Sequence, residues 1–99
     1  MPLETTPFDI AEHLTSNERI AAYLEEAFED GDPAFIASAL GDIARARGMG
    51  SLAKATGISR EALYRSLSDK GNPRLSTLIG VTRALGVKLA IVPGDGVAV

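Results

Sequence analysis

One glycine between two short apolar segments constrains the fold of this chain more than any other feature of its sequence. The stretch ATGISREALYR, residues 55–65, places Gly57 between two short helix-like pieces, and Ser59 can cap the second. A tight helix-turn-helix needs a small residue at the helix crossing, a glycine in the turn and an apolar residue facing back. Ala53, Gly57 and Leu63 have that spacing. The second helix of such a pair presents its N-terminal end outward, where it can enter a DNA major groove about 12 Å wide.

Helical periodicity extends beyond this pair. The sequence predicts five helices, over residues 16–29, 33–47, 51–56, 60–67 and 73–85. Thr15 and Glu18 have the spacing of a capping box at the start of the first helix, and Gly31 is expected to end it. Asp32 and Pro33 then provide an N-cap and a first helical residue for the second helix.

The last predicted helix begins at Asn72 and Pro73 and ends before Gly86. Its expected buried face consists of Leu75, Leu78, Ile79, Thr82 and Leu85. Residues 87–92 then read VKLAIV, a run rich in β-branched side chains that predicts one strand. Because a lone strand cannot satisfy its own hydrogen bonds, either a second copy of the chain or the segment before residue 14 must pair with it.

Charge is distributed unevenly along the chain. Residues 1–42 carry ten acidic residues against one arginine, a net charge of −9, and residues 43–99 carry nine basic residues against three acidic ones, a net charge of +6. Such asymmetry indicates a basic partner for the first part and an acidic partner for the second, although two solvated faces give the same pattern. Acidic residues repel DNA phosphates, so we expect helix 16–29 to lie on the side opposite Arg60.

The residue inventory argues against several kinds of chemistry. The chain has no cysteine and one histidine, His13, so disulfides, thiolate catalysis and cysteine-based zinc sites are excluded. His13 has no recognisable nucleophile setting around it and is interpreted as a surface residue. We therefore expect no enzymatic activity, cofactor or metal site. No apolar run approaches the ~20 residues of a membrane helix and no secretory signal is visible, so a cytoplasmic protein is expected.

A family resemblance covers nearly the whole chain. The segment SLAKATGISREALYRSLSDKGNPRLSTLIGVTRALGVKL resembles the lambda-repressor-like (Xre-type) helix-turn-helix domain, and more narrowly the probable addiction-module antidote proteins. The narrower resemblance rests on EDGDPAFIASALGDIARARGM, SREALYRSLS, GNPRLSTL and RALGVKLAI. It implies one all-α domain over residues 1–99: a five-helix lambda-repressor-like helix-turn-helix fold with an extra N-terminal helix and a short C-terminal β-strand. Its parts are an acidic extension (1–31), a DNA-binding core (32–86) and a strand with a tail (87–99).

The resemblance also implies a function. Such a protein is an antitoxin of a bacterial type II toxin–antitoxin module, which represses its own operon and neutralises a small, basic, RNA-cleaving toxin of the RelE-like kind. The alternatives are a stand-alone Xre-type transcriptional regulator and a protein-interaction domain without DNA binding, which fold analogy cannot separate from the antitoxin. One helix-turn-helix unit covers few base pairs, so we expect a homodimer with residues 87–92 or the preceding helix at its interface.

Candidate DNA contacts lie on and around the second short helix. They are Ser59, Arg60, Glu61, Tyr64 and Arg65 on that helix and Lys54, Lys70, Asn72 and Arg74 at its borders. Arg60 and Arg65 can bond bidentately to guanine or phosphate, and the alternative is a solvated face. Glu61 either accepts from a cytosine amino group or, more commonly, pairs with Arg65. Tyr64 either contacts the DNA backbone or covers the core, Ser59 acts mainly as a cap, and the border residues position phosphates.

Overall fold

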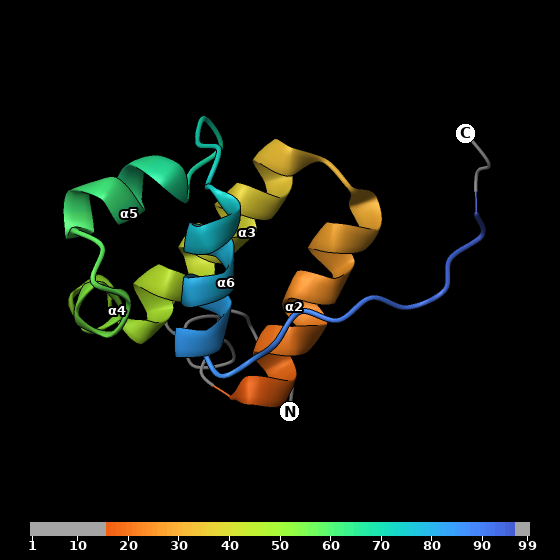
Figure 1. Ribbon diagram of the computed structural model, residues 1–99, viewed down its shortest axis with the longest axis horizontal. Coiled ribbons are helices and arrows are strands. Elements are labelled where there is room, and N and C mark those ends of the chain that lie inside the picture. Colours follow the sequence, from red (N-terminus) through yellow and green to blue (C-terminus); the bar gives the residue numbers. More distant parts are fainter. Residues whose placement is uncertain (1–15, 97–99) are drawn as a thin grey trace, which may run out of the picture.

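The computed structural model describes residues 16–96, which form five helices and no strand. The helices are α2 (Asn17–Asp30), α3 (Pro33–Arg47), α4 (Met49–Thr56), α5 (Arg60–Ser66) and α6 (Leu75–Ala84). Figure 1 shows α3 passing behind α6, with α2 along one side and α4 and α5 at the other. The expected all-helical class is confirmed. None of these helices is both long and apolar enough to span a membrane.

A core of aliphatic side chains holds the helices together. The largest side chains with less than 2% exposure are Ile20, Leu40, Ile43, Leu63, Leu67, Leu85, Val81 and Thr82. Helix α3 contacts α2, α4 and α5, and α4 also contacts α6. Each buried aliphatic side chain stabilises the fold by about 1.5–3 kcal/mol relative to leaving it exposed. The central α3 therefore sets the positions of its neighbours.

The hairpin between α2 and α3 forms close to the predicted residues. The side chain of Ser16 accepts a hydrogen bond from the Arg19 amide at 3.2 Å, so Ser16 is the N-cap of α2. The predicted capping box starting at Thr15 is wrong by one residue, because Ser16 offers the same hydroxyl one position later. Thr15 itself lies outside the described residues. Gly31 ends α2 with a left-handed φ of 80°, and Asp32 caps α3 as predicted.

Helix α4 begins two residues before its predicted start. Gly48 accepts a hydrogen bond from the Leu52 amide at 3.1 Å, which places Met49 at the first helical position. Met49 is 4% exposed and joins the core, so tertiary packing extends α4 beyond what its glycine-rich start would favour. Helix α5 matches its prediction to one residue, with Leu67 as its C-cap.

Helix α6 differs from its prediction in its start and in its buried face. Arg74 is its N-cap, and Asn72 and Pro73 lie in the preceding loop. The buried face is centred on Val81, Thr82 and Leu85, and Leu78 packs partly against the core. The predicted burial of Leu75 and Ile79 is wrong, because these side chains are 70% and 37% exposed. Apolar residues occur on several faces of α6, so the sequence alone does not select the face that packs.

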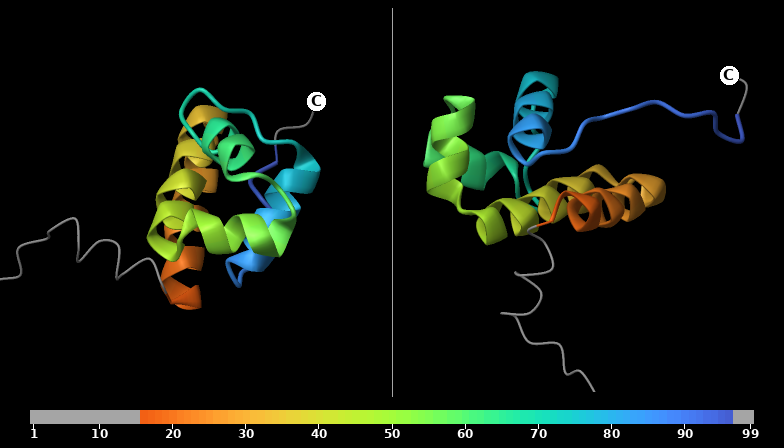
Figure 2. Two further views of the ribbon diagram at one scale, coloured as in Figure 1. Left: turned by 90° about the vertical axis from the view of Figure 1, so that its left-hand side faces the viewer. Right: turned by 90° about the horizontal axis from the view of Figure 1, so that it is seen from below.

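The predicted strand over residues 87–92 is absent from this chain. The Val87 amide donates to the Thr82 carbonyl at 3.0 Å, and beyond it the backbone to residue 96 forms neither helix nor strand. No second strand exists in the described residues to pair with it. The segment leaves the body of the molecule as an extended tail (Figure 2).

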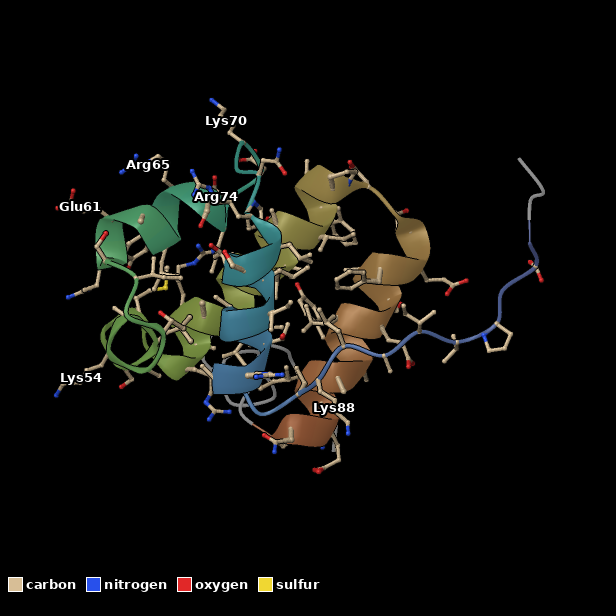
Figure 3. All side chains as sticks on the ribbon, viewed as in Figure 1. Lys54, Glu61, Arg65, Lys70, Arg74 and Lys88 are labelled. Carbon is tan, nitrogen blue, oxygen red and sulfur yellow. The ribbon has the colours of Figure 1, made fainter. Side chains whose placement is uncertain are left out.

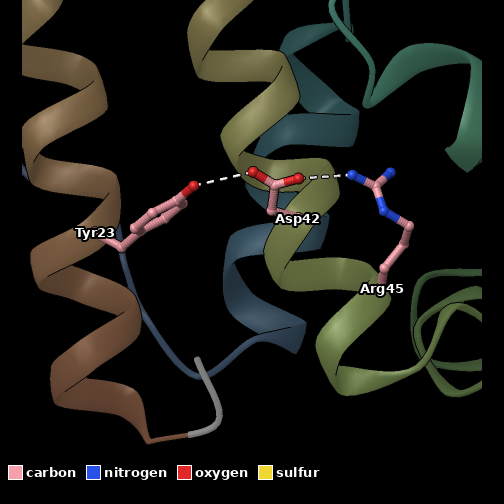
Figure 4. Close-up of polar contacts among 3 residues, drawn as sticks. All are labelled: Tyr23, Asp42 and Arg45. Atoms are coloured by element: carbon pink, nitrogen blue, oxygen red, sulfur yellow. Dashed lines mark hydrogen bonds and ion pairs between the residues drawn. The ribbon is translucent and has the colours of Figure 1, made fainter. Parts of the chain in front are cut away.

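A polar chain of three residues joins α2 to α3 at the surface. The Tyr23 hydroxyl donates to Asp42 Oδ2 at 2.9 Å, and Arg45 Nη2 donates to Asp42 Oδ1 at 2.7 Å (Figure 4). Partial burial, the hydrogen bond to the Asp42 carboxylate and nearby negative charge raise the pKa of the Tyr23 phenol. The neutral phenol therefore acts as the donor that ties α2 to α3.

Helix α5 approaches α3 at a position that requires glycine. A Cβ at Gly41 would collide with the Leu67 carbonyl oxygen at the end of α5 and would lie 3.2 Å from Arg45 Nη1. The absence of a side chain at Gly41 allows this close packing. The Arg45 guanidinium thus lies beside the C-terminal end of α5, where positive charge is favourable.

Replacing Gly41 by alanine tests this contact. We expect Gly41→Ala to lower the free energy of unfolding by about 1–3 kcal/mol, because backbone must move to admit the methyl group. Gly80 is the matched control, since it lies inside α6 with no atom within 4 Å of an added Cβ. Gly80→Ala should raise stability by about 0.5–1 kcal/mol through helix propensity. Urea denaturation measures both, and equal effects would contradict the packing described here.

Candidate nucleic-acid interface

Side chains as well as Gly57 fix the turn between α4 and α5. Gly57 ends α4 with a left-handed φ of 75°, and its amide donates to the Ala53 carbonyl at 2.9 Å. Thr56 Oγ1 donates to the Leu52 carbonyl at 2.8 Å and accepts from the Ile58 amide at 3.2 Å. Sequence reasoning missed the role of Thr56, although a threonine directly before a turn glycine is a local signal for it.

The turn leads into α5, which has a side-chain cap at its N-terminus. The Ser59 side chain accepts from the Ala62 amide at 3.1 Å, which confirms its predicted role as N-cap of α5. Leu63 and Leu67, four residues apart, are both fully buried. The remaining sides of α5 therefore face outward.

All nine predicted site residues are exposed. They are Lys54, Ser59, Arg60, Glu61, Tyr64, Arg65, Lys70, Asn72 and Arg74. Figure 3 shows Lys54, Glu61 and Arg65 projecting from the α4–α5 end of the molecule. Lys70 projects from the loop after α5, and Arg74 lies at the start of α6 (Figure 3). Because three elements supply these side chains, basic groups surround α5 rather than lying on one helix.

The predicted pairing of Glu61 with Arg65 does not occur. Within residues 16–96, the ion pair that forms joins Arg45 to Asp42, two residues of α3. Tyr64 is 45% exposed, so its ring does not serve as a core residue. Glu61 and Arg65 are therefore both exposed and make no ion pair with each other.

Acidic and basic surfaces lie apart in this chain. The exposed acidic residues of the first helices are Glu18, Glu25, Glu26, Glu29, Asp30 and Asp32. Figures 1 and 2 place α2 and α5 at opposite sides of the molecule, with α3 between them. The acidic helix α2 therefore lies away from α5, the helix that carries Arg60, as expected. Repulsion between its carboxylates and an anion bound at α5 is reduced by this separation.

Comparison with known proteins identifies the family of this chain. Residues 4–93 match the family described as probable addiction module antidote protein. The chain belongs to that antidote family. A protein of Haemophilus influenzae (strain Rd), described only as an uncharacterized protein, is 50% identical over 84 residues, which cover 85% of this chain and 87% of the relative. No solved structure matches the chain.

Membership of the antidote family has two consequences. It supports the role of antitoxin in an addiction module and implies a toxin as a partner. It also confirms the family resemblance found in the sequence.

Removing the cap of α5 tests how the site is built. We expect Ser59→Ala to lower the free energy of unfolding by about 1 kcal/mol, because the Ala62 amide loses its acceptor. Ser59→Asn is the matched control, since asparagine caps as well as serine and adds no charge. Thermal denaturation followed by circular dichroism measures both. Equal stability of the two variants would show that Ser59 does not cap α5 in solution.

Proposed function

We propose that this antitoxin binds operator DNA through α4 and α5, acting as a helix-turn-helix, and so represses its own operon. We further propose that it neutralises a RelE-like toxin in the cytoplasm and has no catalytic activity of its own. One observation carries the DNA-binding proposal. The inward leucines of α5 are fully buried, while its outward arginines make no ion pair within the described chain. Because its leucines anchor α5 to the core, the guanidinium groups of Arg60 and Arg65 on the outward face are available to a ligand.

The geometry supports entry of α5 into the major groove. Its N-terminal end carries Arg60 and Glu61 and follows directly after the tight turn at Gly57. Side chains at the start of such a helix reach base edges, and Arg60 is suited to bidentate contact with guanine. Lys70 and Arg74 are exposed on the flanking loop and at the start of α6, which supports contacts with phosphates.

The order of helices supports a lambda-repressor-like domain. Two short helices, α4 and α5, stand between the longer α3 and α6, and α2 precedes them as an extra helix. A single unit of this kind reads few base pairs. We propose that two copies bind together, on half-sites about 34–36 Å apart.

Charge-removing substitutions test DNA binding. Arg60→Ala should lose preference at one or two base positions, at a cost of about 1–3 kcal/mol. Lys70→Ala should weaken binding to all sequences alike and reduce the slope of log affinity against log salt concentration by about 1. Gel shifts on DNA from upstream of this gene, at several salt concentrations, measure both effects.

Arg83 provides the matched control for this test. It is an exposed arginine in the last turn of α6, at the end of that helix away from Arg74, so Arg83→Ala removes the same charge without touching the site. Its affinity should equal that of the wild type. Salt-dependent binding that Arg60→Ala and Lys70→Ala leave unchanged would place the DNA elsewhere.

The acidic helix supports a basic protein partner. Glu25, Glu26 and Glu29 are exposed on α2, on the side of the molecule away from α5. Opposite charges on two proteins accelerate their association and make it sensitive to salt. A toxin that cleaves RNA needs a basic surface, so we propose that α2 attracts it while α5 remains open to DNA.

Removing the negative charge of α2 distinguishes binding of the toxin from binding of the DNA. Changing Glu25, Glu26 and Glu29 together to glutamine should slow association with the small basic protein encoded beside this gene, more at low than at physiological salt. Association with operator DNA should stay equal or rise slightly, because long-range repulsion of phosphates falls. Stopped-flow association rates measure both. An unchanged toxin rate would show that α2 is only a solvated face. Operator binding without any toxin partner would identify a stand-alone regulator.

A further inference from the structure

Helix α6 leaves an apolar stripe uncovered at its N-terminal end. Leu75, Ile79 and Thr82 follow at spacings of four and three residues, so they share one face of the helix. Thr82 is buried at 1% exposure, whereas Leu75 is 70% exposed and Ile79 is 37% exposed. The stripe is therefore buried in the core at Thr82 and exposed to solvent at Leu75.

Helix α2 carries an exposed phenylalanine on the side of the α2–α3 hairpin away from Tyr23. Tyr23 and Phe28 flank the buried stripe of α2 on opposite sides, because each residue turns the helix by about 100°. Tyr23 reaches Asp42 on one side of the α2–α3 hairpin, so Phe28, 39% exposed, lies on the other. Phe35, 47% exposed, lies in the first turn of α3, seven residues before Asp42 and therefore on the same face of α3 as Asp42, so it does not join Phe28.

The exposed apolar residues of α2 and α6 lie toward one end of the molecule. A Cβ at Gly86 would lie 2.6 Å from Asn17 Oδ1, so the end of α6 meets the start of α2. The two helices run in opposite directions in Figure 1. At 1.5 Å per residue, Phe28 and Leu75 each lie about 16 Å along their helices from that meeting point. Phe28, Leu75 and Ile79, here called the apolar patch, therefore lie toward the opposite end of the molecule, where α2 and α6 diverge (Figure 1).

The C-terminal segment carries apolar side chains that are largely exposed. Residues 88–96, here called the arm, leave the body beside α2 and extend away from it (Figures 1 and 2). Leu89 is 44% exposed, Val92 is 75% exposed, and Ile91 is as exposed as in an unfolded chain, at 101%. Such a segment gains stability only by finding an apolar surface and partners for its backbone.

We propose that two copies of this chain exchange arms, each arm covering the apolar patch of the partner copy. One chain carries both halves of the contact, so a two-fold axis satisfies both at once, as in an isologous dimer. The proposal deepens the pairing of two copies on operator DNA, proposed above, by assigning it a surface. That surface leaves the exposed face of α5 and the acidic residues of α2 uncovered.

The amount of apolar surface fits a dimer. The exposed apolar residues of the patch and arm are Phe28, Leu75, Ile79, Leu89, Ile91 and Val92. Weighted by their exposure, they equal between three and four fully exposed side chains, or roughly 350 Å² of apolar surface. A stable interface buries about 800 Å² per partner, of which roughly 56–65% is apolar. Arm and patch together supply most of that requirement.

Charged substitutions on each half test the exchange. Sedimentation of the wild type at about 10 μM should give twice the 10.4 kDa chain mass. Leu75→Glu on the patch and Ile91→Glu on the arm should each weaken dimerisation about a hundredfold, because each dimer loses two apolar contacts. Ala22→Glu is the matched control, since Ala22 is exposed on the outward face of α2 and should leave the mass unchanged.

Cysteine trapping then identifies the contact. The chain has no cysteine of its own, so one can be introduced at a time. A mixture of Leu75→Cys and Ile91→Cys chains should form a disulfide-linked pair under mild oxidation, whereas Ala22→Cys mixed with Ile91→Cys should not. A monomeric wild type, a dimer that both glutamate variants leave intact, or trapping no better than the control would overturn the exchange.

Gel shifts on the same samples distinguish a failure of arm exchange from a failure of operator binding. A monomer that binds the operator contradicts arm exchange alone. A trapped dimer that binds no DNA supports the exchange and contradicts operator binding alone.

Discussion

The contact between α3 and the end of α5 at Gly41 is the constraint on which the rest of this structure depends. It brings the Leu67 carbonyl against the α3 backbone and allows Leu63 and Leu67 to reach the core. With its C-terminal end held there and its N-terminal end capped by Ser59, α5 has both ends fixed. Seven residues are too few for a helix to be stable alone, so this support from packing makes α5 available as a binding element.

The same central helix separates the two charged surfaces. Helix α3 holds α5 through Gly41 and holds α2 through the bond from Tyr23 to Asp42. Asp42 also binds Arg45, whose guanidinium lies near the end of α5, so one carboxylate connects both attachments. The arrangement allows an acidic helix and a basic helix to coexist in a chain of 99 residues without neutralising each other. The proposed binding of both DNA and a basic toxin needs that separation.

Local chemistry determined which features the sequence could predict. The turn at Gly57, the cap at Ser59 and the Asp32–Pro33 start of α3 follow from backbone preferences of a few adjacent residues, and they were predicted correctly. Features that depend on tertiary packing were missed. Burial of Met49 lengthens α4, and α6 packs through Val81 rather than Leu75, although both residues are apolar. The strand required a partner that residues 16–96 do not contain. The exposure of the site residues on α5 followed from the inward spacing of Leu63 and Leu67, whereas the unpaired state of Glu61 depends on side-chain positions that spacing does not determine.

Amide chemical shifts of the isotope-labelled protein during titration with its operator duplex test the central claim most directly. We expect the largest shifts in α5, in the loop over residues 67–74 and at the start of α6, with small shifts in α2. Such a pattern requires that DNA meets the face that Gly41 and Ser59 hold in place. Shifts concentrated on α2 or α3, with α5 unchanged, would contradict the account.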